Sequence, residues 1–163
     1  WLNLHTAHFV SVPKQQLFFE ACAESSVWTQ GLPKKTGSDE IHRFDVVFTS
    51  PPYYNTEVYS IDKNQSSNKY KSYENWKAEF LSKMLENCGR LLTDDGIFVI
   101  NVKNSATCGT LVEDVVEIMT LLLGFELTDK RYLFISSRPS KNSKKDQSEP
   151  VLFFSRQSNK NVT

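Results

Sequence analysis

Glycine is scarce in this chain and never gathers into a ligand-binding turn. The 163 residues contain six glycines, and no two of them are spaced as Gly-x-Gly. Where a backbone must pass close to a bound cofactor, glycine is needed because any Cβ would occupy the space of the ligand. The chain therefore lacks the usual sign of a glycine-rich cofactor turn.

Cysteine and histidine are equally few, and their positions exclude a familiar zinc motif. None of them forms the closely spaced ligand pairs of structural zinc sites. The six residues are His5, His8, Cys22, His42, Cys88 and Cys108. We predict no metal site and interpret the cysteines as reduced core residues, with Cys88 and Cys108 in helices. This interpretation favours an intracellular location.

Neither sign of charge is in excess. Lys and Arg number 19, as do Asp and Glu, so the formal net charge is zero. Unaided binding to nucleic acid usually requires a basic surface that displaces counterions, and this balance argues against it. The chain as given also shows no signal peptide and no membrane-spanning run, although a cut N-terminus would hide one. We therefore expect no membrane partner.

The most informative segment is a proline-locked turn in the middle of the chain. The apolar run Phe44–Phe48 predicts a buried strand, and Thr-Ser-Pro-Pro-Tyr-Tyr follows it at 49–54. Two prolines fix the local backbone, so the Ser50 side chain and the nearby carbonyls are held as hydrogen-bond acceptors. Tyr53 offers a ring for stacking, which contributes about 1–3 kcal/mol per nucleic-acid base. The turn predicts a pocket for a flat, amine-bearing ring.

The segments after this turn alternate between helix and strand, which predicts an α/β fold. Apolar residues at three- and four-residue steps indicate a first helix, and a continuous apolar run indicates a covered parallel strand. The predicted elements are a helix over 73–92, a turn over 93–96, a strand over 97–102, a helix over 108–123 ending at Gly124, and strands over 125–135 and 150–155.

Ser-Pro-Pro-Tyr after an Asp-containing apolar strand resembles the catalytic motif of S-adenosylmethionine-dependent DNA amino-methyltransferases. These enzymes modify N4 of cytosine or N6 of adenine, and the Thr-Ser-Pro-Pro-Tyr spelling is most typical of the N4-cytosine members. The surrounding elements resemble the second half of the Rossmann-like class I methyltransferase fold, which ends in an antiparallel hairpin. The resemblance covers roughly residues 44–156. It leaves 1–43 as an N-terminal flanking segment and 157–163 as a tail.

The resemblance implies a role for each residue of the turn. A base swung out of the duplex would stack on Tyr53, while its amino group donates to the Ser50 hydroxyl and to a carbonyl near Pro51. We therefore expect site-specific amino-methylation of DNA, with S-adenosylmethionine as cofactor. The expected catalytic residues are Ser50, Pro51, Pro52 and Tyr53, the substrate-binding residues are Tyr54, Asn55, Lys63, Lys69 and Arg138, and the cofactor-binding residues are Thr49 and Ser50.

The cofactor-binding half of that fold is not recognisable in the sequence. Neither the glycine turn nor an acidic residue that would hold ribose hydroxyls is present. Two explanations compete. The chain is a fragment whose cofactor half lies elsewhere, or it is a cofactor-free subunit that works with a second methyltransferase subunit. RNA and protein-amide methylation also stay open, because a side-chain amide presents the same flat NH2 group.

Overall fold

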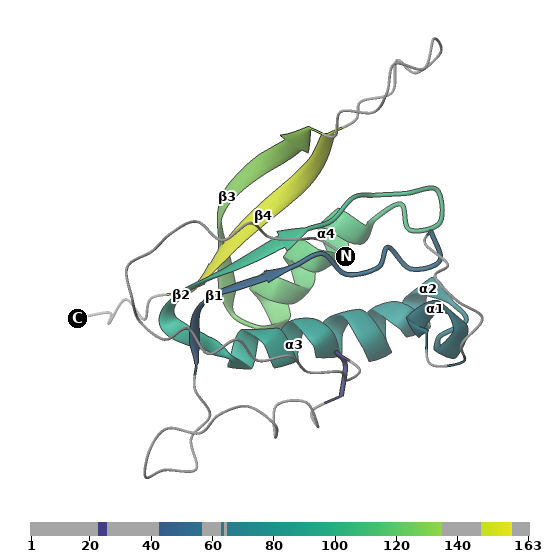
Figure 1. The fold of residues 1–163 in the computed structure, drawn as a ribbon, viewed down its shortest axis with the longest axis horizontal. Helices are drawn as coiled ribbons and strands as arrows, with labels where there is room; N and C mark the ends of the chain where they lie inside the picture. Colours follow the sequence, from purple (N-terminus) through teal and green to yellow (C-terminus); the bar gives the residue numbers. More distant parts are fainter. Residues whose placement is uncertain (1–22, 26–42, 57–62, 64, 135–147, 158–163) are drawn as a thin grey trace, which may run out of the picture.

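A computed structural model describes residues 23–25, 43–56, 63, 65–134 and 148–157 of the chain. Its centre is a four-stranded sheet in the order β1-β2-β4-β3 (Figure 1). β1 pairs with β2 in parallel, whereas β4 runs antiparallel to both β2 and β3. The strands are β1 (Phe44–Thr49), β2 (Leu92–Asn101), β3 (Phe125–Phe134) and β4 (Ser148–Arg156). The positions of the predicted strands and the C-terminal hairpin are confirmed. The predicted burial of the first strand is wrong, because most of β1 is exposed, and Ile97 of the expected covered strand is 43% exposed.

A continuous helical segment connects β1 to β2. It consists of α2 (Tyr73–Trp76), the π-helical turn η2 (Lys77–Leu81) and α3 (Ser82–Arg90). The Ser72 side chain caps its start by accepting a hydrogen bond from the Asn75 backbone N–H, as N-cap serines do. The predicted helix over 73–92 is therefore confirmed to within two residues.

The second predicted helix begins later than expected. It comprises α4 (Leu111–Glu117) and η3 (Ile118–Leu122), whereas the prediction placed its start at Cys108. Cys108 instead lies in a turn, where it forms an isolated bridge with Ser105. The end of the helix agrees with the prediction, because Gly124 has a φ of 69°, the left-handed conformation typical of a glycine after a helix.

The predicted turn over 93–96 lies inside β2. The register with β1 shifts there, from Phe44 opposite Leu92 to Val46 opposite Ile97. Gly96 is required by contact rather than by an unusual φ, since an added Cβ would lie 2.6 Å from Leu92 Cγ. The segment is a bulge that allows β2 to run on without a break.

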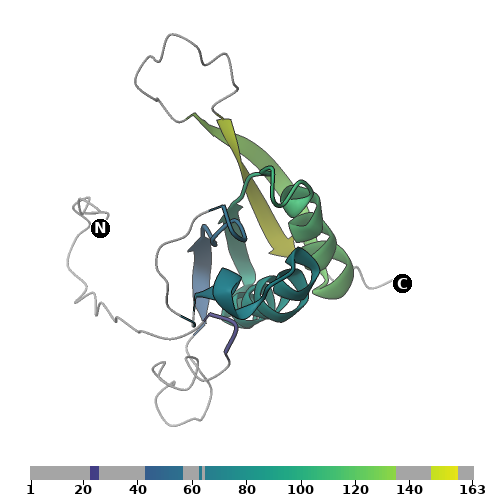
Figure 2. The ribbon, with the colours of Figure 1, turned by 90° about the vertical axis from the view of Figure 1, so that its right-hand side faces the viewer.

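The helices in the described part of the chain all lie on one face of the sheet, as Figures 1 and 2 show. On that face Phe98, Ile100 and Phe154 are fully buried. The opposite face carries exposed apolar side chains, including Val46 (59% exposed) and Phe48 (66%). Such a large apolar surface on a folded unit marks a place for another element or partner.

A short helix, α1 (Ser66–Lys69), lies between the proline turn and α2. The N-terminal flanking segment over 1–43 lies outside the described residues, apart from 23–25 and 43. None of the helices in the described part of the chain is long and apolar enough to cross a membrane.

Candidate active site

The proline turn begins directly at the end of β1 and is tightly folded. Ser50 is exposed, while Pro51 is buried and Pro52 is half-buried. The Tyr54 N–H donates to the Pro52 carbonyl at 3.0 Å, and the Thr56 N–H donates to the Tyr53 carbonyl at 3.0 Å. These bonds reverse the chain and leave the Ser50 hydroxyl on the surface, where a substrate can reach it.

Tyr53 folds back over the ends of two other strands. Its hydroxyl lies 3.4 Å from Asn101 Oδ1 at the end of β2 and 3.3 Å from Glu149 Oε2 on β4. The residue is only 8% exposed. The structure therefore brings Tyr53 to the predicted place, but as a ring largely enclosed by its surroundings rather than an open stacking platform.

Tyr54 belongs to the core rather than to a substrate pocket, which corrects its expected role as a substrate-binding residue. It is 8% exposed, and its hydroxyl donates to the Lys71 carbonyl at 2.7 Å. Its ring contacts those of Tyr73 and Trp76 at centroid distances of 5.7 and 5.8 Å. Tyr54 also has a φ of 53°, which is costly for a bulky residue and persists only where packing holds it. This packing fixes the turn.

A cluster of small polar side chains joins the turn to the loop after β2. Thr56 Oγ1 lies 2.7 Å from Ser105 Oγ and 3.0 Å from Thr107 Oγ1. The Cys108 thiol lies 3.7 Å from the Tyr53 carbonyl oxygen and is buried. The second loop thus supports the turn from the side of α4.

Asp114 on α4 connects the two helical segments beneath this region. It accepts hydrogen bonds from the Tyr73 hydroxyl at 2.6 Å, from Thr110 at 2.8 Å and from the Lys77 ammonium at 3.1 Å. Burial alone would raise the pKa of this carboxyl, but the three donors outweigh it and the pKa lies below its usual value. The pKa of Tyr73 is raised by burial and by this carboxylate, so its hydroxyl stays protonated.

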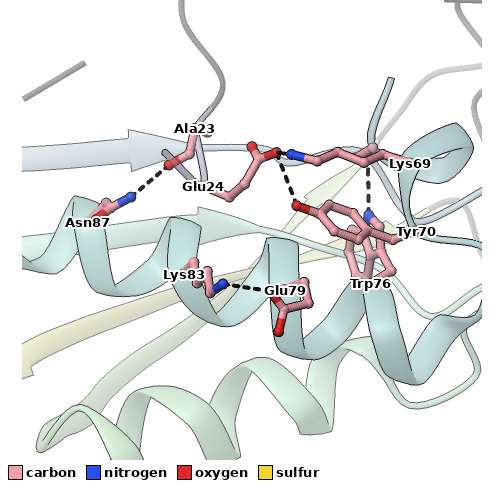
Figure 3. A network of polar contacts seen from close by, with 9 residues as sticks. Ala23, Glu24, Lys69, Tyr70, Trp76, Glu79, Lys83 and Asn87 are labelled. Carbon is pink, nitrogen blue, oxygen red and sulfur yellow. Dashed lines mark hydrogen bonds and ion pairs between the residues drawn. The ribbon is translucent and has the colours of Figure 1, made fainter. Parts of the chain in front are cut away.

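Lys69 is paired with a carboxylate of the same chain, and its expected contact with the substrate stays a prediction. Its ammonium forms an ion pair with Glu24 at 3.0 Å, and Tyr70 donates to the same carboxylate at 3.4 Å (Figure 3). Hydrogen bonds to Tyr70 and Glu24 raise the pKa of Lys69. Lys63 and Asn55 are exposed, as substrate contacts would need to be. Arg138 lies outside the described residues.

The described residues do not form a site for a nucleoside cofactor. Thr49 is half-buried and Ser50 exposed, but the described glycines include no Gly-x-Gly pair that would let the backbone approach such a ligand. The carboxylate beside the turn, Glu149, is already engaged by Tyr53. In the part of the chain that the structure describes, no cluster of acidic, histidine and cysteine side chains could hold a metal ion.

Three residues that support the turn were not expected from the sequence. Asn101 and Glu149 lie 48 and 96 residues from their partner Tyr53. Asp114 lies 41 residues from its partner Tyr73. No local pattern marks such pairs. The sequence offered one signal, which is that Asn101 lies at the carboxyl end of a predicted strand. Ligands bind at that edge of an α/β sheet.

Comparison with protein families identifies the chain. The model of a DNA methylase family, the N6/N4 methylases, matches residues 44–163. The chain belongs to this family. No curated protein sequence matches it.

The fold of this methylase family member is also found in solved structures. A chain described as a DNA modification methylase of Thermus thermophilus has a TM-score of 0.54 and 20% identity, over 82% of this chain and 50% of that one. The same methylase complexed with S-adenosyl-L-methionine gives a TM-score of 0.50 at 20% identity, over 84% and 54%. The PvuII DNA methyltransferase, which is cytosine-N4-specific, gives 0.50 at 19% identity, over 80% and 46%.

These matches establish a partial class I methyltransferase fold. The chain spans about half the length of the solved structures that it matches.

Proposed function

We propose that this chain supplies the base-binding half of a DNA amino-methyltransferase, with residues 44–156 as its functional unit and N4 of cytosine as the favoured target. The observation that carries the proposal is the exposed Ser50 hydroxyl at the end of β1, set in a turn that is fixed from both sides. Membership in the N6/N4 methylase family supports it. Serine at position 50 is the spelling most typical of N4-cytosine enzymes.

The chemistry asked of these residues is mainly positioning. A base swung out of the duplex costs a few kcal/mol in lost stacking and pairing. Its amino group donates one hydrogen to the Ser50 hydroxyl, and the other to a carbonyl near Pro51. Both contacts orient the nitrogen lone pair toward the methyl donor, and holding reactants in such geometry is a large source of rate acceleration. Lys63 and Asn55 are exposed, and we assign them contacts with the nucleic acid.

Because the described residues do not fit the cofactor, we assign S-adenosylmethionine to a second half. That half lies in further sequence of the same protein or in a partner subunit. The matched Thermus methylase, which has a complex with S-adenosylmethionine, is about twice as long as the part that aligns.

The test is methyl transfer by this chain together with the proteins that co-purify with it from its source. Labelled S-adenosylmethionine and duplex DNA are supplied, and the labelled base is identified after digestion. We expect label on cytosine N4, and a loss of about a hundred-fold in rate for Ser50→Ala, which is the order of loss for misplaced reacting groups. Ser155→Ala, near the other end of β4 from the turn, is the control and should keep full activity.

The outcome separates the proposal from its alternatives. Label on adenine N6 would change the assigned target base but leave the proposed site unchanged. Label in RNA or protein would show that DNA is not the substrate. If transfer requires this chain yet Ser50→Ala retains full activity, the chain is a cofactor-free subunit. The missing glycine turn favours that second candidate as well, since a non-catalytic partner needs no cofactor site.

A further inference from the structure

The carboxylate of Glu149 lies where three strand ends meet. Tyr53 follows β1, Asn101 ends β2, and Glu149 is the second residue of β4. The phenol hydroxyl of Tyr53 lies within hydrogen-bonding distance of both the Asn101 and the Glu149 side chains, at 3.4 and 3.3 Å. A hydroxyl has one proton, so the two acceptors share one donor.

The backbone next to Glu149 is held by hydrogen bonds to the end of β2. The carbonyl of its neighbour Pro150 accepts hydrogen bonds from Asn101 Nδ2 at 3.0 Å and from the Val102 N–H at 3.2 Å. The first residues of β4 are thereby fastened to the end of β2. Glu149 is half-buried, and it forms no ion pair with any described residue. Charge pairing within the described part of the chain therefore does not explain its place beside the turn.

We propose that Glu149 is a positioning residue for Tyr53, and that it fixes the position of this largely enclosed ring, and of the turn that carries it, beside the substrate base. This inference rests on the proposed function, because it concerns the same base pocket. The Tyr53 hydroxyl reaches the Asn101 and Glu149 side chains together. These two acceptors hold the ring tip at the ends of β2 and β4, while the turn holds the Tyr53 backbone.

The two acceptors are not equivalent. Asn101 is buried, at 7% exposure, and its amide also fastens β4, so its loss would disturb the sheet. Glu149 can be changed with less effect on folding, because Asn101 still accepts the Tyr53 proton. Removal of Glu149 should therefore move or loosen the ring without unfolding the chain, which is the mark of a positioning residue.

The experiment uses the full chain labelled with 13C in its tyrosine rings. NMR reports the shift and the flip rate of the Tyr53 ring, which is identified by its disappearance in Tyr53→Phe. Titration with 2′-deoxycytidine and 2′-deoxyadenosine then measures base binding. The variants are Glu149→Ala and Glu149→Gln, and Glu126→Ala at an exposed position of β3 is the matched control.

We expect Glu149→Ala to shift the Tyr53 ring signal, to speed its flips and to weaken base binding about two- to ten-fold, the range of one lost hydrogen bond. Glu149→Gln keeps an oxygen acceptor and should rescue most of the loss. In the Tyr53→Phe background, Glu149→Ala should have no further effect on base binding, because the hydroxyl through which it acts is absent.

Two results would overturn the inference. An unchanged Tyr53 ring signal in Glu149→Ala would show that the carboxylate does not hold the ring. A loss of binding that persists in the Tyr53→Phe background would show that Glu149 acts on the base directly or through stability. The ring signals need no ligand, so a wild-type chain that binds neither nucleoside would count against the proposed function while the ring readout still decides the role of Glu149.

Discussion

At the scale of single residues, Asp114 shows how a buried charge can fasten two helices. It is 6% exposed and accepts bonds from α2, η2 and the residue before α4 through Tyr73, Lys77 and Thr110. The hydrogen bonds that lower its pKa make the ionised form part of the folded state. Because Tyr73 also contacts the Tyr54 ring, the hydrogen bonds to Asp114 support the proline turn as well.

We predict that Asp114→Asn destabilises the chain by about 1–3 kcal/mol at pH 7, the range for hydrogen bonds to a charged group. The folded pKa is depressed, so the contribution is present above the unfolded pKa of about 4 and is lost as pH falls through the folded value. Urea unfolding between pH 7 and pH 3 should show the gap to wild type shrinking in the acid range. Glu117→Gln, exposed on the same helix, should show no gap, and a gap that is constant with pH would contradict the role of the charge.

The residue roles show what sequence reasoning reached and where it stopped. The Ser-Pro-Pro-Tyr turn and its place after a strand were predictable, because strand pattern and proline chemistry are local. The burial of Tyr54 and the ion pair of Lys69 were not, because the partners Tyr73, Trp76 and Glu24 lie up to 45 residues away. Aromatic and lysine side chains can either contact other residues of the protein or bind a ligand. The fold, not the sequence pattern, decides which of the two they do.

At the scale of elements, Gly96 permits β2 to continue through its bulge. A Cβ at this position would lie 2.6 Å from Leu92 Cγ and 2.9 Å from Thr93 Oγ1, and Leu92 is fully buried. We predict that Gly96→Ala costs about 1–3 kcal/mol, as overpacking in a core does. Thermal and urea unfolding measure the loss.

Gly109→Ala is the matched control for this prediction. An added Cβ there would meet no atom within 4 Å, so this variant should unfold within about 0.5 kcal/mol of wild type, as surface substitutions do. Equal stability of both alanine variants would mean that Leu92 can move aside and that the bulge does not depend on glycine.

The sequence predicted the strands and the helix before β2 well, because their apolar periods are long and regular. It missed the late start of α4. Asn104 Oδ1 accepts a hydrogen bond from the Val112 N–H at 2.8 Å. A side chain from the preceding loop thus pairs with a backbone N–H in the first turn of α4. Cys108, which was expected as a core residue within this helix, is buried but lies in the turn before the helix.

At the scale of the whole molecule, the described helices bury one face of the sheet and leave the other face exposed. β1 and β3 are the two edges of the described sheet, and β1 presents Phe44, Val46 and Phe48 at 41%, 59% and 66% exposure. An unpaired edge strand with exposed apolar side chains is prone to pair with another chain. This surface agrees with a chain that spans about half the length of its solved relatives.

We predict that the chain alone self-associates through this surface. Sedimentation velocity over a range of concentrations should show species larger than a monomer. Val46→Lys together with Phe48→Lys should shift the distribution to monomer, because lysine on an edge strand opposes pairing. Both side chains are largely exposed, so the midpoint of thermal unfolding should change by no more than a few degrees.

Leu121→Lys provides the control, since Leu121 is 76% exposed but lies on η3, which contacts β3 at the opposite edge of the described sheet from β1. If this variant reduces association as much as the double variant does, general surface hydrophobicity rather than the edge of β1 drives it. A wild-type chain that stays monomeric at every concentration would contradict the prediction outright. Loss of association only in the β1 variant would locate the contact on the strand that leads into Ser50, and so place any partner next to the proposed base pocket.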